Sequence, residues 1–179
     1  MKVINLYGGP GTGKSTTAAS LFALMKRNGL NVEQVTEFAK DLVWTERNKE
    51  LGDQIYIFGK MYHKLWRLKD KVDYVIMDSP LPLSIYYDKG RTPGLREFGM
   101  RIYNTFDNYN YKLYRYFPYQ QEGRYQTEDE ANKVDDEIYD FMRDNGISSL
   151  SVNMFGVTPK SNEEIIYNHL INNVATTTK

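Results

Sequence analysis

The chain has 179 residues, a length at which one domain can bury a continuous core without disulfide bonds or metal ions. Basic and acidic residues number 23 each, so the zero net charge provides no overall positive field to hold a long nucleic-acid backbone. There is no cysteine, no apolar run long enough to cross a bilayer and no leader pattern. We therefore expect a single cytoplasmic domain over residues 1–179.

The first half of the chain alternates between strand and helix patterns. A β-rich run at 3–7 precedes a glycine cluster and a helical pattern that stops at Asn28-Gly29. A second strand is expected at 32–36, two helical stretches follow, and a third, buried strand covers 72–78. This βαβαβ order predicts a parallel sheet with helices on both faces, and ligands beyond the carboxyl ends of its strands.

The second half has a weaker pattern between residues 79 and 110, where the sequence predicts only one helix. The expected elements are a helix at 95–106, a strand at 111–117, a helix begun by the capping box of Thr127 and Glu130, a strand at 151–155, and a helix capped by Ser161 and Glu164. Together these elements predict a three-layer αβα fold around a five-stranded parallel sheet.

A phosphate-binding loop is predicted at 8–15, where the sequence matches Gly, four residues, Gly-Lys-Ser/Thr between an expected strand and an expected helix. The residues expected to bind ATP are Gly8, Gly9, Gly11, Thr12, Gly13, Lys14, Ser15 and Thr16. Glycines let the backbone approach phosphate oxygens, so that amide groups and the helix amino end hold the β-phosphate. Lys14 is expected to act catalytically on the β and γ phosphates, Ser15 to bind magnesium, and Thr16 to contact the α-phosphate. A glycine-rich turn before an ordinary helix is the alternative.

Asp78 closes the third expected strand, where an acid can hold Mg²⁺ through water in the manner of a Walker B motif. With Ser15 it forms the expected metal site, and we count it among the catalytic residues. Capping of the following turn is its alternative role. The next residue is Ser79, whereas hydrolytic ATPases of the RecA and AAA type usually carry a glutamate there. The sequence thus disfavours a motor or a hydrolase.

A second motif, Asn132-Lys133-Val134-Asp135, matches the guanine-specificity pattern of GTPases. In GTPases that pattern follows a hydrophobic strand, whereas here it lies inside the helix that begins after Thr127. No Asp-x-x-Gly follows the third strand either. The sequence therefore argues against a GTPase.

The whole chain resembles the P-loop nucleoside and nucleotide kinase superfamily. It looks nearest to small kinase-like ATPases of bacteriophages and to nicotinamide riboside kinases. In deoxynucleoside kinases a glutamate just beyond the second strand is the general base, followed by a tryptophan and by a glutamine that reads the base. The resemblance implies that Glu37 is catalytic and that Glu37, Trp44 and Gln54 bind the acceptor. The alternatives are a helix-capping acid for Glu37, and core or helix-surface positions for the other two.

The chain departs from this superfamily after Asp78, where the usual arginine is missing. This departure puts a conventional monophosphate kinase in doubt. Arg91, Arg96 and Arg101 are the candidates to replace that arginine, and Arg91 is the one we expect to bind the acceptor.

The resemblance also implies a short lid at about 119–127, which would close over the phosphates. Arg124 in this segment would bind ATP and neutralise charge on the transferring phosphoryl group, with Gly123 as a hinge. An exposed loop arginine is the alternative, and Arg115 is a weaker candidate for the same task. The loop at 156–159 would border the adenine.

The expected activity is an ATP- and Mg²⁺-dependent transfer of the γ-phosphate to a hydroxyl of a nucleoside, a nucleotide or a modified base. The acceptor would be a small molecule, or a hydroxymethylpyrimidine in phage DNA; no membrane partner is expected. Two alternatives stay open: a nucleotide-dependent binding switch, and a slow P-loop ATPase without a phosphoryl acceptor. His63 and His169 lack metal-ligand spacing and predict no metal centre.

Overall fold

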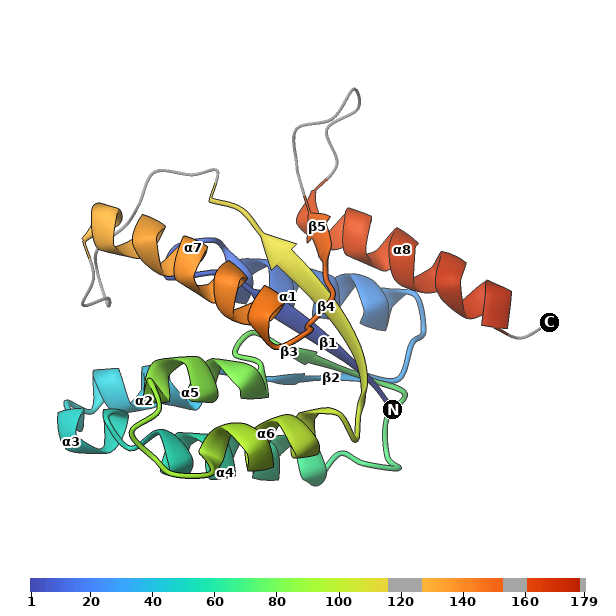
Figure 1. Cartoon of the computed structure of the whole chain (residues 1–179). Helices are drawn as coiled ribbons and strands as arrows, with labels where there is room; N and C mark the ends of the chain where they lie inside the picture. The colour runs from blue at the N-terminus through green and yellow to red at the C-terminus, as the bar shows by residue number, and fades with distance from the viewer. Residues whose placement is uncertain (116–126, 153–160, 178–179) are drawn as a thin grey trace.

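A five-stranded sheet forms the centre of the computed structural model, which describes residues 1–115, 127–152 and 161–177, the last five as backbone only. The strands are β1 (Lys2–Tyr7), β2 (Val32–Val35), β3 (Tyr74–Met77), β4 (Asp107–Leu113) and β5 (Leu150–Val152). They lie in the order β2-β3-β1-β4-β5, and every neighbouring pair is parallel (Figure 1). The predicted five-stranded parallel sheet is confirmed.

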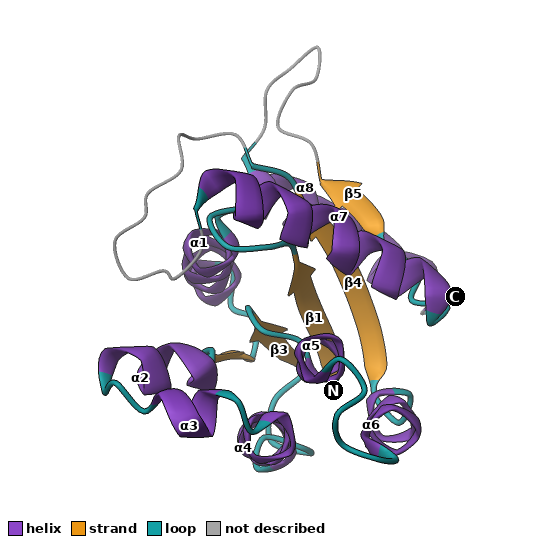
Figure 2. Ribbon diagram, turned by 60° about the vertical axis from the view of Figure 1, so that its left-hand side comes forward, coloured by secondary structure: helices purple, strands orange, loops and turns teal. Residues whose placement is uncertain are grey.

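Helices cover both faces of this sheet, which confirms the three-layer prediction. On one face lie α1 (Lys14–Arg27) and α8 (Asn162–Thr177). The helices of the other face are α2 (Phe38–Trp44), α3 (Asn48–Leu51), α4 (Gln54–Trp66), α5 (Leu81–Asp88), α6 (Leu95–Tyr103) and α7 (Glu128–Asp144). Of these, α4, α5 and α6 pack side by side beneath the sheet (Figure 2).

The alternation of side chains along β1 explains the two cores. Ile4 and Leu6 point to the face covered by α1 and α8, whereas Val3 and Tyr7 point to the opposite face. All four side chains are buried. Because β1 is apolar on both faces, it occupies the middle of the sheet.

The register places the ends of three strands together. Val35 of β2 and Asn5 of β1 both pair with Met77 of β3. The connections after β1 and β3 leave toward opposite faces, since α1 lies on one face and α5 on the other. In open α/β sheets such a switch point creates a crevice that binds ligands. Here it brings together the loop after Tyr7, the turn after β2 and Asp78.

Between residues 79 and 113 the sequence analysis missed one helix and placed the start of one strand too late. The segment read as irregular contains α5, because Pro80 takes the N-cap position and Pro82 lies in the first turn, where a missing N–H costs little. The fourth strand begins at Asp107 instead of residue 111. Its asparagines are accommodated because the buried Asn5 amide donates to Asn108 Oδ1 at 2.9 Å and to Asn110 Oδ1 at 3.0 Å.

Smaller differences concern helix boundaries and number. Three helices lie between β2 and β3 where two helical stretches were expected, and α6 ends at Tyr103. The capping box of Thr127 and Glu130 is present as predicted. In the part of the chain that the structure describes, no helix has both the length and the apolar character needed to cross a membrane.

Candidate active site

The phosphate-binding loop connects β1 to α1 and has the backbone that its glycines permit. Gly8 has a φ of 152°, and a Cβ there would lie 2.6 Å from Thr12 Oγ1. Gly13 has a φ of 82° at the N-cap of α1. This left-handed residue ends the loop and leaves the first amide groups of α1 directed at the loop. The arrangement suits a bound phosphate.

Lys14 folds over the loop that precedes it. Its ammonium donates to the carbonyl oxygen of Gly8 at 2.7 Å and to that of Gly9 at 2.8 Å. Across the loop, the Thr12 hydroxyl also donates to the Gly9 carbonyl, at 3.0 Å. The positive charge is therefore held beside the loop, where phosphate oxygens would bind.

Asp78 is a buried carboxylate at the end of β3, only 4% exposed. Burial raises the pKa of this carboxyl, while the Ser15 hydroxyl and the Lys14 charge act in the opposite direction. Among the described residues, its Oδ1 has no hydrogen-bond partner. A buried carboxylate oxygen without a partner, near a serine hydroxyl, fits the oxygen ligands that Mg²⁺ prefers.

No group of three or more His, Cys, Asp or Glu side chains gathers as a metal site among the described residues. Mg²⁺ is usually held by one or two carboxylates together with waters and substrate phosphates. Ser15 and Asp78 would hold the ion.

Glu37 lies at the N-cap position of α2, directly after β2, but its side chain makes no capping hydrogen bond. The observed geometry therefore does not use it as the helix-capping acid considered above. Burial raises the pKa of its carboxyl; Lys14 and Lys40 oppose this rise, and Asp78 adds to it. A carboxylate with a raised pKa next to a phosphate loop is suited to accept a proton from a hydroxyl.

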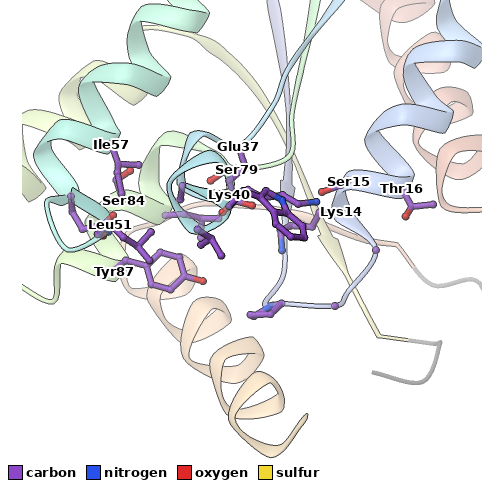
Figure 3. A pocket seen from close by; sticks show the side chains of 18 of the residues that line it. Lys14, Ser15, Thr16, Glu37, Lys40, Leu51, Ile57, Ser79, Ser84 and Tyr87 are labelled. Atoms are coloured by element: carbon purple, nitrogen blue, oxygen red, sulfur yellow. The ribbon is translucent and has the colours of Figure 1, made fainter. Parts of the chain in front are cut away.

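One cavity of about 520 Å³ is lined by the phosphate loop together with Glu37 and Ser79. Figure 3 shows Lys14, Ser15, Glu37, Lys40 and Ser79 around its phosphate end, with Leu51, Ile57, Ser84 and Tyr87 farther from the loop. Apolar side chains also line the cavity: Ala39, Val43, Trp44, Leu51, Ile57 and Leu83. The cavity thus extends well beyond the space that phosphates would need.

The four residues predicted to bind the acceptor, Glu37, Trp44, Gln54 and Arg91, all line this cavity. Trp44 ends α2 and is 67% exposed, so it is not a core residue. Gln54 begins α4 and is 7% exposed, with its amide donating to the Leu51 carbonyl at 2.9 Å. Arg91 follows α5, and its guanidinium is oriented by donation to two carbonyl oxygens of that helix, at 2.9 and 3.2 Å.

The other two candidate arginines lie away from the cavity. Arg96 donates to Asn145 Oδ1 at 3.0 Å, and Arg101 is exposed on α6. Neither lines the cavity, which leaves Arg91 as the one of the three that does.

The predicted lid and adenine loop lie outside the described residues. This applies to Arg124 and Gly123, to most of the segment 119–127, and to residues 156–159. Arg115 is described, and its guanidinium donates to Asp135 Oδ2 at 2.7 Å.

Several residues near the site escaped the sequence analysis. Ser84 and Tyr87 lie three residues apart on α5 and line the cavity together, but they were missed because α5 was not predicted. Lys40 follows Glu37 by three residues in the first turn of α2 and lines the same cavity. Asp135 was set aside with the GTPase-like motif, which the structure places inside α7.

The comparisons with known proteins agree with this fold. A family model described as an AAA domain matches residues 3–157, and no curated protein matches the chain. Deoxyadenosine kinase from M. mycoides, solved with the products dCMP and a flexible dCDP, has a TM-score of 0.57 at 20% identity, covering 96% of this chain and 100% of that chain. The same kinase with bound dATP gives 0.57 at 19% identity, covering 95% and 99%.

Shikimate kinase from Acinetobacter baumannii, in complex with shikimate, has a TM-score of 0.50 at 13% identity and covers 96% of this chain and 93% of that chain. At such identities these similarities show a shared P-loop kinase-like fold and leave the substrate of this chain undetermined.

Proposed function

The chain belongs to the AAA-domain family of P-loop proteins, and on this premise we propose that it is a kinase. It transfers the γ-phosphoryl group of ATP to a hydroxyl of a nucleoside-type acceptor. The observation that carries this proposal is the cavity, which has a phosphate end at Lys14 and a second part that continues past Glu37 to Arg91. A binding switch or a simple ATPase needs no such second part. Ser79, in place of a water-polarising glutamate, also supports transfer over hydrolysis.

In the proposed reaction the acceptor hydroxyl oxygen forms a bond to the γ-phosphorus, and the bond from that phosphorus to the β–γ bridging oxygen breaks. Glu37 takes the hydroxyl proton and ADP leaves. Lys14 neutralises charge on the β and γ phosphates, and Arg124 would do so from the lid. Mg²⁺, held by Ser15 and Asp78, would supply further charge neutralisation on the phosphates.

The proposed acceptor is planar at one end and carries the reacting hydroxyl at the other. Trp44 offers an exposed ring for stacking, and the apolar side chains that line the cavity suit a heteroaromatic base. Gln54 keeps amide hydrogen-bonding capacity beyond its bond to Leu51 for the edge of that base. Lys40 and Arg91 add positive charge to the cavity. This charge favours an acceptor that carries a phosphate, either a nucleotide or a nucleotide unit within DNA, over an uncharged sugar.

A transfer assay with γ-labelled ATP tests this proposal and identifies the acceptor. The panel contains nucleosides, nucleoside monophosphates, nicotinamide riboside and a DNA oligonucleotide with hydroxymethylpyrimidine. We expect label in one class of acceptor, and loss of that label in Glu37→Gln. Label released only as inorganic phosphate with every acceptor would contradict the proposal and favour an ATPase.

A further inference from the structure

Asp135 joins helix α7 to the phosphate loop, 126 residues earlier in the sequence. Its Oδ1 accepts the backbone N–H of Gly9 at 2.5 Å, and its Oδ2 accepts Arg115 Nη2 at 2.7 Å. Both carboxylate oxygens are thus engaged inside the protein. The aspartate of the GTPase-like motif therefore contacts the phosphate loop itself.

The pair of Asp135 and Arg115 is mostly buried. Their side chains are 15% and 8% exposed, in contrast to the exposed pair of Asp140 and Arg143 on the same helix. A buried carboxylate with both oxygens hydrogen-bonded has a fixed orientation. Breaking either bond would leave the carboxylate charge or its donor buried without that partner, which is costly.

Helix α7 is held in place for this contact from two directions. The Tyr139 hydroxyl donates to the carbonyl oxygen of Leu113, which ties α7 to the end of β4 two residues before Arg115. On the loop side, a Cβ on Gly9 would lie 3.1 Å from the Ala131 carbonyl oxygen and 3.2 Å from Val134 Cγ1. The glycine at this position therefore permits the close approach of α7.

The peptide between Gly8 and Gly9 is held at both of its polar ends. Its carbonyl oxygen accepts the Lys14 ammonium at 2.7 Å, and its N–H donates to Asp135. The two groups of a trans peptide point in opposite directions, so this unit lies between a cation and an anion. A rotation of this peptide would break both bonds and would move the carbonyl that orients Lys14.

We propose that Asp135 is a positioning residue for the phosphate loop: it fixes the Gly8–Gly9 peptide, and through it the Lys14 ammonium, in the arrangement that receives the β-phosphate. This role rests on the proposed nucleotide site. A bound phosphate would attract the Lys14 ammonium away from the Gly8 carbonyl. The hydrogen bond from Gly9 N–H to Asp135 would then still hold the Gly8–Gly9 peptide in place. Arg115 holds the carboxylate for this bond.

The test measures the affinities of the full chain for ADP and AMP, which differ by the β-phosphate. In Asp135→Ala we expect ADP affinity to fall by about tenfold or more, the effect of one hydrogen bond to a charged group, while AMP affinity stays within about threefold. Asp135→Asn keeps an acceptor for Gly9 and should retain the ADP-to-AMP ratio of the parent within about threefold. Asp140→Ala, on the exposed part of α7, is the matched control and should change neither affinity.

Thermal unfolding of the same variants separates positioning from stability. Asp135→Ala leaves the buried Arg115 without this partner and can prevent folding. In that case the double variant Asp135→Ala/Arg115→Met, which removes both charges, replaces the single variant. The double variant should show the same loss in the ADP-to-AMP ratio. A lower Tm with an unchanged ratio in both variants would overturn the positioning role, and so would an equal loss in Asp135→Asn. Failure of the parent chain to bind ADP more tightly than AMP would instead contradict the proposed nucleotide site.

Discussion

At the scale of single residues, the site contains two carboxylates whose burial in the charged form costs free energy of folding. Asp78 and Glu37 both have raised pKa values because burial disfavours their charged forms. Lys14 lies near both and reduces the rise, but its ammonium is bonded to loop carbonyls. Mg²⁺ bound together with phosphates would offset the negative charge of the two carboxylates.

Replacement of Lys14 by alanine should abolish transfer and leave the fold intact. The substitution removes a charge directed at the phosphoryl group from the first residue of α1, and such groups contribute roughly 100- to 1,000-fold in rate. Steady-state transfer rates and a thermal scan measure the two effects. Activity within about threefold of the parent would contradict the assignment of the phosphate loop.

Asp78→Asn should weaken the dependence on Mg²⁺ while making the free protein more stable. A carboxyl whose pKa is raised by folding binds its proton more readily in the folded state, so stability falls as pH rises from the ordinary value through the raised one. At pH 7 the variant escapes this cost, and we therefore expect its Tm to exceed that of the parent. The difference should vanish in acid below the ordinary pKa.

Titration of nucleotide with and without Mg²⁺ completes that test. Affinity for metal-free nucleotide should change less than affinity for the magnesium complex, since the lost charge acts through the ion. Equal losses for both, together with a lower Tm, would indicate a structural role for Asp78.

Glu37→Gln should lower transfer by about 100- to 10,000-fold, because glutamine keeps the shape and cannot accept the proton. Nucleotide affinity should barely change. In the parent, the rate should rise with pH through the pKa of Glu37, at a pH above that of an ordinary glutamate, because the base works only when ionised. This acid limb should be missing in the variant. Normal transfer with a lower Tm would mean that Glu37 is a structural residue after all.

At the scale of elements, helix packing around α5 is tight and was the least predictable part of the fold. A Cβ on Gly99 of α6 would lie 2.9 Å from Ile85 Cδ1 and 3.2 Å from Phe58 Cε2, whereas a Cβ on Gly59 of α4 would meet nothing within 4 Å. Gly59→Ala should therefore stabilise the protein by about 0.5–1 kcal/mol through helix propensity. Gly99→Ala should be less favourable than Gly59→Ala by about 1 kcal/mol or more, because overpacking offsets that gain.

Denaturant unfolding of the two alanine variants measures this difference directly. Equal stabilisation by both substitutions would show that α4, α5 and α6 separate easily, contrary to the packing described above.

The elements that the sequence predicted well are those specified by neighbouring residues. The phosphate loop needs only eight consecutive residues, and the capping box of α7 needs only Thr127 and Glu130. Strand β4 was misplaced because its asparagines are satisfied by Asn5, about a hundred residues away in the chain. The contact of Asp135 with Gly9 was missed for the same reason: long-range pairing leaves no local pattern.

At the scale of the whole molecule, the chain order brings the two halves of the proposed reaction to one edge of the sheet. Groups for ATP come from β1, β3 and α1, and those for the acceptor come from the α2–α5 side. With zero net charge, the molecule has no general field for a polymeric substrate. An acceptor within DNA would therefore depend on local contacts at Lys40 and Arg91, and its binding would weaken steeply with salt.

The most direct test of this account is the stoichiometry of ADP, free phosphate and phosphorylated acceptor in one reaction. The account predicts that a saturating acceptor raises ADP formation, with one phosphorylated acceptor per ADP and little free phosphate. Free phosphate equal to ADP, at a rate that no acceptor changes, would contradict it.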